Sequence, residues 1–376
     1  MSALIGRLPA FPWDSLAAAA ARARSHPGGI VDLSVGTPVD PTPPVAQDAL
    51  RAASDASGYP AVWGTPALRQ SILGYLARRW GCVDVGERGV LPTVGSKQFV
   101  ALLPTMLGLG PGDAVVVPSL AYPTYEVGAR VAGTNAVATD DPSQLAEIRP
   151  RLVWINSPAN PHGQILPPDT LRAWVDAARA CGAVLASDEC YGEYAWDAEA
   201  VSILDPAVCG GSPDGLLAVF SESKRSNVAG YRAGFVAGDP QLVGDLLEIG
   251  KHAGLMMPAP VQAAMAVLLD DQTHVDEQRD RYRRRRTVLR FALECAGFRV
   301  ERSEGSLYLW CTRDEPGRAS VDFLASLGIL VAPGDIYGPD GRDYVRVALT
   351  ATDERVEAAV GRLTDLPGSG VTSPRA

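Results

Sequence analysis

Residues 218–238 read AVFSESKRSNVAGYRAGFVAG, and this stretch decides the fold. It opens with an apolar run that is typical of a buried strand and then turns polar at Ser221, Ser223 and Lys224. Arg232 follows the lysine after eight residues and has a glycine two positions away on each side. Ligands of open α/β sheets bind beyond the carboxyl ends of the strands, so this strand end is a candidate binding site.

Similar apolar runs alternate with helical patterns from about residue 45 to 270. This alternation is the signature of parallel βαβ units. The sequence therefore predicts an α/β protein with a large, doubly wound and mainly parallel sheet. The predicted strands are 114–119, 151–157, 183–189 and 216–223, and the clearest predicted helices are 66–80 and 168–180.

The pattern changes after about residue 270. A long charged helix, two strand-like runs and an amphipathic helix near 353–363 indicate a small α+β domain. We expect a large domain at 45–275 and a small domain made of 1–44 and 276–366. The tail, 367–376, is expected to be disordered.

Composition excludes several classes of protein. A net charge of −9 opposes binding to nucleic acid, and the basic run 279–286 is interpreted as a solvated helix face. Six scattered cysteines without a Cys-x-x-Cys pair or nearby histidines predict reduced thiols and no metal site. Without a signal peptide or a long apolar stretch, we expect a cytoplasmic protein that does not enter membranes.

Other polar residues lie beyond the remaining predicted strands. Singly, each has an ordinary explanation as a helix cap, a turn or a surface side chain. A Gly-Ser-Lys sequence that opens an apolar helix also offers free N–H groups to an anion. These residues are Gly95, Ser96 and Lys97 in GSK, Asn160 in NPHG, and Asp188 and Tyr191 in DECY.

Taken together, these motifs resemble the fold-type I, pyridoxal-phosphate-dependent aminotransferases of class I and II. The family pattern Ser-x-[Ser/Ala]-Lys, followed after eight residues by Arg-x-Gly, is SESKRSNVAGYRAG here. NPHG and DECY match the family's Asn-Pro-x-Gly and Asp-x-x-Tyr in the same order. The resemblance runs from SVGTP (34–38) to YVRVALTATDERV (344–356) and implies the fold-type I architecture.

The resemblance also implies roles for these residues. Lys224 would form a Schiff base with the cofactor aldehyde and then move the proton between Cα and C4′. Asp188 would keep the pyridine nitrogen protonated. Tyr191 and Asn160 would hydrogen-bond the 3′ oxygen. The residues implied for the cofactor phosphate are Arg232, Ser221, Ser223, Gly95, Ser96 and Lys97.

Further positions match the family more loosely. Tyr122 is preferred over Tyr125 as the aromatic residue that stacks on the cofactor ring. Tyr59 matches a tyrosine that reaches the phosphate of the neighbouring subunit, which implies a homodimer.

Substrate binding is implied for three residues. Arg346 would hold the α-carboxylate of the substrate, with Gly36 and Asn160 close by. His162 stands where the family usually has threonine. We expect it to point to solvent, with a substrate contact as the alternative.

Within the family, the chain looks most like the succinyldiaminopimelate aminotransferases of bacterial lysine biosynthesis. This resemblance implies transfer from L-glutamate to N-succinyl-2-amino-6-oxopimelate. Positive side chains at the pocket mouth would then serve the distal carboxylates, with Lys97, Arg225 and Arg22 as candidates. The alternatives are another amino-acid transaminase, a β-lyase or decarboxylase, and a cofactor-binding regulator that is not an enzyme.

Overall fold

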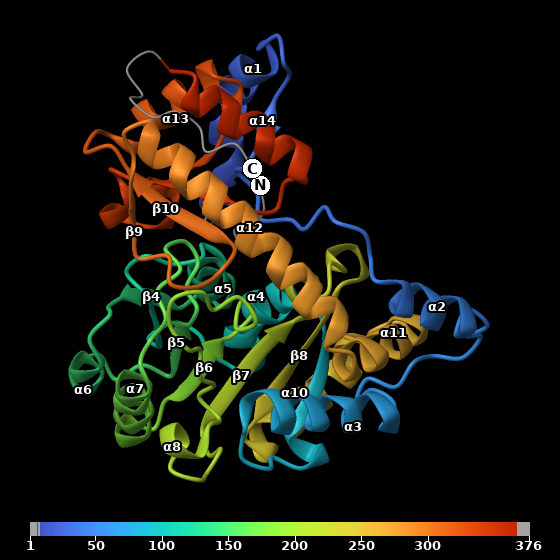
Figure 1. Cartoon of the computed structure of the whole chain (residues 1–376). Coiled ribbons are helices and arrows are strands. Elements are labelled where there is room, and N and C mark those ends of the chain that lie inside the picture. Colours follow the sequence, from blue (N-terminus) through green and yellow to red (C-terminus); the bar gives the residue numbers. More distant parts are fainter. Residues whose placement is uncertain (1–5, 7, 367–376) are drawn as a thin grey trace.

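The computed structural model describes residue 6 and residues 8–366 of the 376-residue chain (Figure 1). The tail predicted to be disordered, 367–376, lies outside the described residues. One part of the molecule is built around a seven-stranded sheet, and the upper part in Figure 1 around a four-stranded sheet.

The seven-stranded sheet has the order β2-β8-β7-β6-β5-β3-β4. Its pairs are parallel except for the two made by β8, which is antiparallel to both β2 and β7. The predicted mainly parallel sheet is thereby confirmed. The strands are β2 (Val90–Val94), β3 (Ala114–Val117), β4 (Asn135–Ala138), β5 (Leu152–Asn156), β6 (Val184–Asp188), β7 (Leu216–Ser221) and β8 (Ala233–Gly238).

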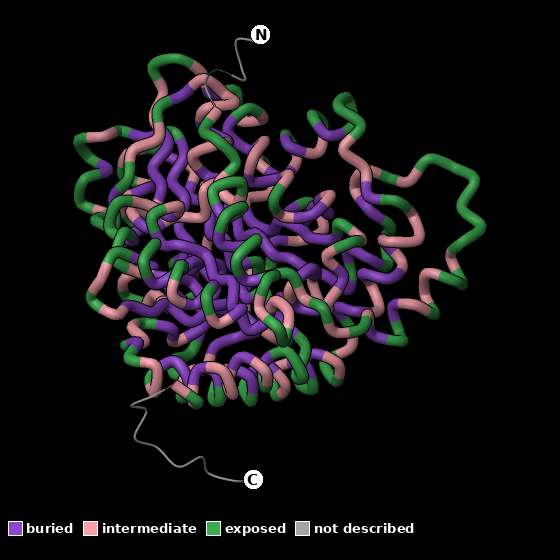
Figure 2. Tube along the Cα trace, turned by 90° about the horizontal axis from the view of Figure 1, so that it is seen from above, coloured by how far each residue is buried: buried purple, intermediate pink, exposed green. Residues whose placement is uncertain are grey.

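The central strands are apolar except toward their carboxyl ends, because both faces of the sheet are covered. On β5, Leu152 and Trp154 pack into one buried cluster while Val153 and Ile155 pack into another. Side chains alternate between the faces of a strand, so a strand buried on both faces needs an unbroken apolar run. Figure 2 shows the buried segments gathered in the centre of the molecule.

The smaller part has a four-stranded antiparallel sheet of order β12-β13-β10-β9. A separate parallel pair joins the N-terminal segment to it through Val31 and Ile329. These strands are β1 (Val31–Asp32), β9 (Arg299–Glu301), β10 (Tyr308–Thr312), β11 (Ile329–Leu330), β12 (Ala332–Pro333) and β13 (Val345–Ala348).

Helices cover both sheets, and the long α12 runs from beside α11 up into the smaller part (Figure 1). The first helices are α1 (Ala17–Arg24), α2 (Pro44–Ala52), α3 (Pro66–Tyr75), α4 (Ser96–Met106), α5 (Thr124–Ala132), α6 (Leu145–Ile148) and α7 (Pro168–Cys181). The others are α8 (Pro206–Cys209), α9 (Glu222–Arg225), α10 (Pro240–Ala253), α11 (Ala259–Asp270), α12 (Thr273–Cys295), α13 (Gly317–Ser326) and α14 (Asp353–Thr364).

The four predicted strands and the predicted helices form close to their expected positions. The helix predicted at 66–80 widens after Tyr75 into a π-helical turn and ends at Gly81, whose φ of +60° suits glycine. The strand predicted at 216–223 is shorter, because the chain turns into α9 at Glu222. The domain boundaries near residues 45 and 275 stay a prediction.

Two expectations from composition can be compared with the described residues. No helix in that part of the chain is long and apolar enough to cross a membrane. All six cysteines are free, and only Cys209 and Cys311 are fully buried.

Candidate active site

The carboxyl ends of β5, β6 and β7 bring three polar residues to one edge of the sheet. Asn156 lies opposite Asp188 in the parallel register, and Ser221 ends the next strand. The Asn156 side chain donates to the carbonyl oxygen of Asp188 at 2.8 Å and accepts from the backbone N–H of Asn160 at 2.7 Å. Asn156 therefore holds the NPHG loop against the end of β6.

Asp188 is buried, and its carboxylate could pair with a cation. Its carboxylate accepts hydrogen bonds from the Tyr125 hydroxyl at 2.8 Å and the Cys190 backbone at 3.2 Å. Burial raises its pKa, although these bonds and the charge of Lys224 act in the opposite direction. A cationic partner would stabilise its ionised form, and the protonated ring nitrogen of pyridoxal phosphate is such a partner.

Lys224 stands on α9, one turn beyond the end of β7. Its Nζ donates to the carbonyl oxygen of Gly36, and the Tyr194 hydroxyl donates to its backbone carbonyl at 2.8 Å. Gly36 is buried against Tyr308, because a Cβ there would lie 2.1 Å from the Tyr308 hydroxyl oxygen. The lysine amine is thus held between the large sheet and the N-terminal segment.

The start of α4 forms a place for an anion. Gly95 precedes this eleven-residue helix with a φ of +74°, and a Cβ there would lie 2.3 Å from Nη2 of Arg232. The guanidinium of Arg232 therefore packs over the helix start. Arg232 itself adopts a φ of +56°. Free N–H groups, a helix dipole and a guanidinium fit the phosphate of pyridoxal phosphate.

The other residues implied for the phosphate lie at different depths. Ser221 and Ser223 are buried, Ser96 is half-buried, and Lys97 is exposed with its Nζ 5.9 Å from the Phe11 ring centroid. The two serines of β7 and α9 share the sheet edge with Asp188, whereas Lys97 points toward the N-terminal segment.

Arg346 is buried beside the same edge. Its Nη1 donates to the Asn160 side chain at 2.8 Å and its Nη2 to the Ser34 carbonyl at 2.7 Å. Its guanidinium lies 3.9 Å from the Tyr308 ring centroid, and the Tyr308 hydroxyl is 2.9 Å from that of Tyr191. The structure thus brings Arg346, Asn160 and Tyr191 together through Tyr308.

Tyr122 and Tyr125 occupy different positions. Tyr125 is fully buried, stacks on Trp154 at 5.1 Å and bonds to Asp188. Tyr122 is half-buried, and burial, together with Asp188, raises its pKa to about 12. Of the two rings, only that of Tyr122 has an accessible part, which favours it as the residue that stacks on a ligand.

Tyr59 does not join the site of its own chain. It is 97% exposed, on the segment that projects beyond α2 (Figures 1 and 2). Residues 54–59 are exposed as well. This tyrosine could act only on another molecule.

Two expectations for single residues are wrong. His162 does not point to solvent: it is 7% exposed, its Nδ1 accepts from the Gln164 backbone, and burial, with nearby Arg302, lowers its pKa to about 3. Arg225 is not at a pocket mouth, because it is 4% exposed and lies between Glu193 and Glu222.

Arg22 lies away from the candidate site. It lies on α1 and pairs with Asp322 of α13 at 3.5 Å, with the side chain 55% exposed. Both helices belong to the upper part in Figure 1, away from the edge of the large sheet.

Sequence reasoning missed Tyr308 and Tyr337, which surround Arg346. The Tyr337 ring centroid is 5.1 Å from the guanidinium, and its buried hydroxyl has no partner among the described residues. Tyr308 lies in GSLYLW, which the pattern indicates only as a strand. Its position became visible only through the pairing of β10 with β13, where Trp310 lies opposite Arg346.

The chain matches the family model described as aminotransferase class I and II over residues 29–363. A probable aminotransferase of Mycobacterium tuberculosis is 59% identical over 95% of this chain and 85% of its own length. The 4-dedimethylamino-4-oxo-anhydrotetracycline transaminase OxyQ of Streptomyces rimosus is 58% identical over 95% and 99%.

More distant matches have the same family character. An LL-diaminopimelate aminotransferase of Aquifex aeolicus is 32% identical over 90% of this chain and 91% of its own. Among solved structures, an aminotransferase from Neisseria meningitidis superposes with a TM-score of 0.85. It is 31% identical, and the match covers 97% of this chain and 98% of the other.

Proposed function

This chain belongs to the class I and II aminotransferases, which depend on pyridoxal phosphate, and we propose that it uses L-glutamate to aminate N-succinyl-2-amino-6-oxopimelate. The products are 2-oxoglutarate and N-succinyl-LL-2,6-diaminopimelate. When bound, the cofactor supplies an aldehyde that exchanges amino groups and a ring that withdraws electrons. The chain's residues provide everything else.

The buried guanidinium of Arg346 carries this proposal. Glutamate and the keto end of the acceptor both have a carboxylate next to the reacting carbon. A guanidinium matches a carboxylate with two parallel hydrogen bonds. Among the described residues, Arg346 donates to Asn160 and to the Ser34 carbonyl but to no carboxylate, and its Nε has no partner. It is therefore a suitable receptor for that carboxylate.

The proposed chemistry uses four further residues directly. With the cofactor bound, the Nζ of Lys224 would move a proton from Cα of glutamate to C4′ of the cofactor, and in the second half of the exchange from C4′ to Cα of the product. Asp188 holds the positive charge of the ring nitrogen, since an ionised carboxylate favours the protonated form. Tyr191 and Asn160 would donate hydrogen bonds to the 3′ oxygen of the cofactor.

The remaining residues bind and orient. The cofactor phosphate is assigned to the start of α4 (Gly95, Ser96 and Lys97) and to Ser221, Ser223 and Arg232. Tyr122 covers the ring, and Gly36 lets the N-terminal backbone approach the substrate closely. We also propose a homodimer, supported by the exposure of Tyr59, which would complete the partner's phosphate site. The unpaired cysteines support a cytoplasmic location.

A second acceptor is favoured by one comparison. OxyQ, as its name states, acts on a ketone carried by an anhydrotetracycline, and it is 58% identical over nearly its full length. Val35 and Val39, on either side of Gly36, are 42% and 51% exposed. Exposed apolar side chains this close to Gly36 would offer a polycyclic ketone apolar contact. The donor half of the reaction is the same in both cases.

The test follows the absorbance of the bound cofactor. Glutamate should change the spectrum, and N-succinyl-2-amino-6-oxopimelate should restore it, with 2-oxoglutarate and the amino product detected in equal amounts. Lys224→Ala, which lacks the amine, is the control and should show no exchange. If a polycyclic ketone restores the spectrum and N-succinyl-2-amino-6-oxopimelate does not, the polycyclic ketone is the acceptor. A protein that binds no cofactor after reconstitution would contradict both.

A further inference from the structure

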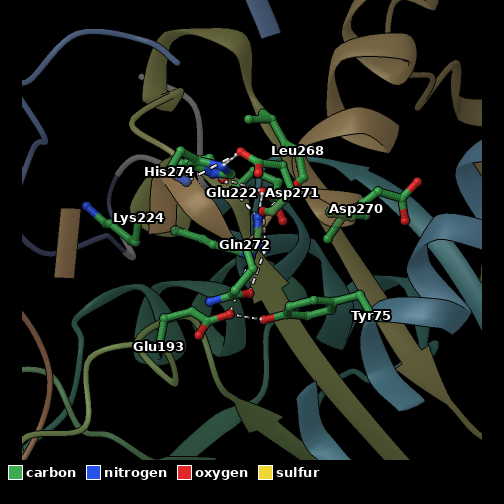
Figure 3. Close-up of polar contacts among 12 residues, drawn as sticks. Tyr75, Glu193, Glu222, Lys224, Leu268, Asp270, Asp271, Gln272 and His274 are labelled. Carbon is green, nitrogen blue, oxygen red and sulfur yellow. Dashed lines mark hydrogen bonds and ion pairs between the residues drawn. The ribbon is translucent and has the colours of Figure 1, made fainter. Parts of the chain in front are cut away.

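A chain of hydrogen bonds lies behind the turn that carries Lys224 (Figure 3). The Ser226 hydroxyl oxygen lies 2.8 Å from Oε2 of Glu222 and 2.9 Å from Nε2 of His274. The other ring nitrogen of His274 lies 2.6 Å from Oδ2 of Asp271. The chain thus connects α9 with the joint between α11 and α12.

The members of this chain become more accessible along its length. Glu222 and Ser226 are each 1% exposed, whereas the side chains of His274 and Asp271 are 11% and 31% exposed. One end is therefore inside the protein and the other is close to solvent.

Arg225 packs against the middle of this chain. Its Nη1 donates to Ser226 at 3.2 Å and to the Leu268 carbonyl at 2.7 Å. The titratable and charged groups facing His274 are Asp271, Glu222 and Arg225, together with Glu193 from the turn after β6. Glu193 pairs with Arg225 at 3.3 Å and so balances the charge of this arginine.

The number of available protons limits the protonation states of these hydrogen-bonded groups. Although partial burial opposes it, the hydrogen bonds from His274 and from the backbone lower the pKa of Asp271, so this carboxylate is ionised and accepts from Nδ1–H. Ser226 has one hydroxyl proton, which can serve either Glu222 or His274 but not both. The remaining contact needs a proton on Glu222 or on His274.

The environment favours Glu222 as the holder of that proton. Burial raises the pKa of Glu222, against the charge of Arg225. Burial also lowers the pKa of His274, although Asp271 acts in the opposite direction. In the resulting arrangement Glu222 donates to Ser226, Ser226 donates to His274, and His274 donates to Asp271. Each polar group then has a partner.

We propose that Glu222, Ser226 and His274 share one proton through these two hydrogen bonds, and that this relay holds the turn on which Lys224 stands. His274 is then a positioning residue. Lys224 extends away from the relay in Figure 3, so the effect passes through the backbone of α9. The second half of this inference rests on the role of Lys224 in the proposed function.

The relay is tested without activity by proton and carbon NMR of the enzyme labelled at histidine Cε1. The protein has four histidines, and the signal that disappears in His274→Gln is that of His274. The pH midpoint of His274 should lie below the ordinary value of about 6.5. Ser226→Ala removes a donor to the neutral ring and should raise that midpoint by about one pH unit.

Glu222→Gln provides the decisive variant. Its amide donates to Ser226 as a protonated carboxyl does, so the midpoint should move by less than about half a unit. A wild-type midpoint above 6.5 that falls by a unit or more in Glu222→Gln would place the proton on His274 and overturn the assignment. An unchanged midpoint in Ser226→Ala would exclude the relay. If Ser226→Ala does not fold, the Glu222 variant still decides.

The positioning role has its own readout. In His274→Gln, the pH midpoint of the bound cofactor's absorbance should shift by about half a unit or more, and kcat should fall about five- to tenfold with little change in KM. His252→Gln, at an exposed histidine of α10, should change neither. If His274→Gln behaves like His252→Gln, the positioning role is wrong. If the wild type binds no cofactor, the proposed function fails, and the NMR titration decides the relay separately.

Discussion

Two buried arginines lie near the edge of the large sheet, and their surroundings differ. Arg225 is 4% exposed, and each nitrogen of its guanidinium donates to a protein oxygen, with Glu193 and Glu222 beside it. Arg346 is 2% exposed, stacks on Tyr308 and donates to Asn160 and Ser34. Among the described residues, no carboxylate pairs with Arg346, and its Nε has no partner.

The difference in surroundings indicates a structural role for Arg225 and a binding role for Arg346. A buried cation needs a counter-charge, because removal from water costs several kcal/mol. Arg225 has a counter-charge within the protein, Glu193, and a protein oxygen for each nitrogen of its guanidinium. Arg346 has tyrosine rings in place of a counter-charge, so a substrate anion would complete it. The comparison predicts that the two residues fail in different ways when they are changed.

The largest effect on stability is expected at Arg225. Arg225→Ala removes the buried cation beside Glu193, which then keeps only the partly exposed Arg79. It also leaves the carbonyl oxygens of Leu268 and Asp271 without their donor, so the free energy of unfolding should fall by about 3 to 5 kcal/mol. Urea unfolding followed by circular dichroism measures this. Arg225→Ala with wild-type stability and lost activity would reverse the comparison.

Arg346→Ala should show the opposite pattern. With no receptor for the carboxylate, kcat/KM for glutamate should fall about 100- to 1,000-fold, corresponding to about 3 to 4 kcal/mol of lost binding in the transition state. Arg346→Lys, which keeps the charge but loses the fork, should recover only part of it. The measurement is steady-state kinetics at saturating cofactor, and unaltered kinetics would show that Arg346 is structural.

Glu189 tests the pH dependence of a buried carboxyl that forms no ion pair within the described part of the chain. Its Oε1 accepts from the Ile203 backbone at 2.9 Å, its Oε2 has no partner in the described chain, and burial raises its pKa to about 7. The folded state therefore binds this proton more tightly than the unfolded state. That contribution to stability is present below about pH 4.5 and is lost as the pH rises through 7.

Glu189→Gln should remove this dependence. Relative to the wild type, the variant should gain on the order of 2 kcal/mol between pH 5 and pH 8. Thermal or urea unfolding at the two pH values checks the sign. A variant that is relatively less stable at pH 8 would mean that Glu189 is ionised in the folded protein.

A smaller effect is expected at Tyr308. Tyr308→Phe keeps the ring over Arg346 and removes the hydroxyl that lies 2.9 Å from Tyr191. One such hydrogen bond contributes about 1 kcal/mol, so kcat/KM should fall about fivefold. Tyr308→Leu, which also loses the ring, should cost more than Tyr308→Phe. Equal losses would assign the whole effect to the hydroxyl.

The smallest effect is expected at Arg22, an arginine that is neither buried nor near the site. Its exposed pair with Asp322 should contribute less than about 1 kcal/mol. Arg22→Ala should therefore change neither the unfolding free energy by more than this nor the KM for N-succinyl-2-amino-6-oxopimelate. A several-fold increase of that KM would restore Arg22 as a substrate-binding residue.

Much of the large sheet was predictable because strand length and apolar continuity are local properties. The same reasoning placed Asp188 and Lys224 at one edge, since parallel strands end on the same side. Which strand lies next to which is not local. The antiparallel β8, between β2 and β7, could not be read from its own residues.

The errors have the same origin. His162 is buried because a segment far along the chain covers it: the Ser303 backbone donates to its carbonyl at 2.8 Å. Arg225 follows Lys224 directly in the sequence, but it points to the α11–α12 joint, which lies more than 40 residues later. A single sequence shows which residues are polar and leaves open what covers them.

Gly36 restricts how this sequence can diverge. Any side chain there would collide with the Tyr308 hydroxyl, and Tyr308 also holds Arg346 and Tyr191 in place. A substitution of the glycine could be accepted only together with a smaller residue at 308. That second change would remove the ring on which the Arg346 guanidinium packs. Over evolution these positions should therefore change together or not at all, although they lie on different sides of the chain's longest helix in sequence.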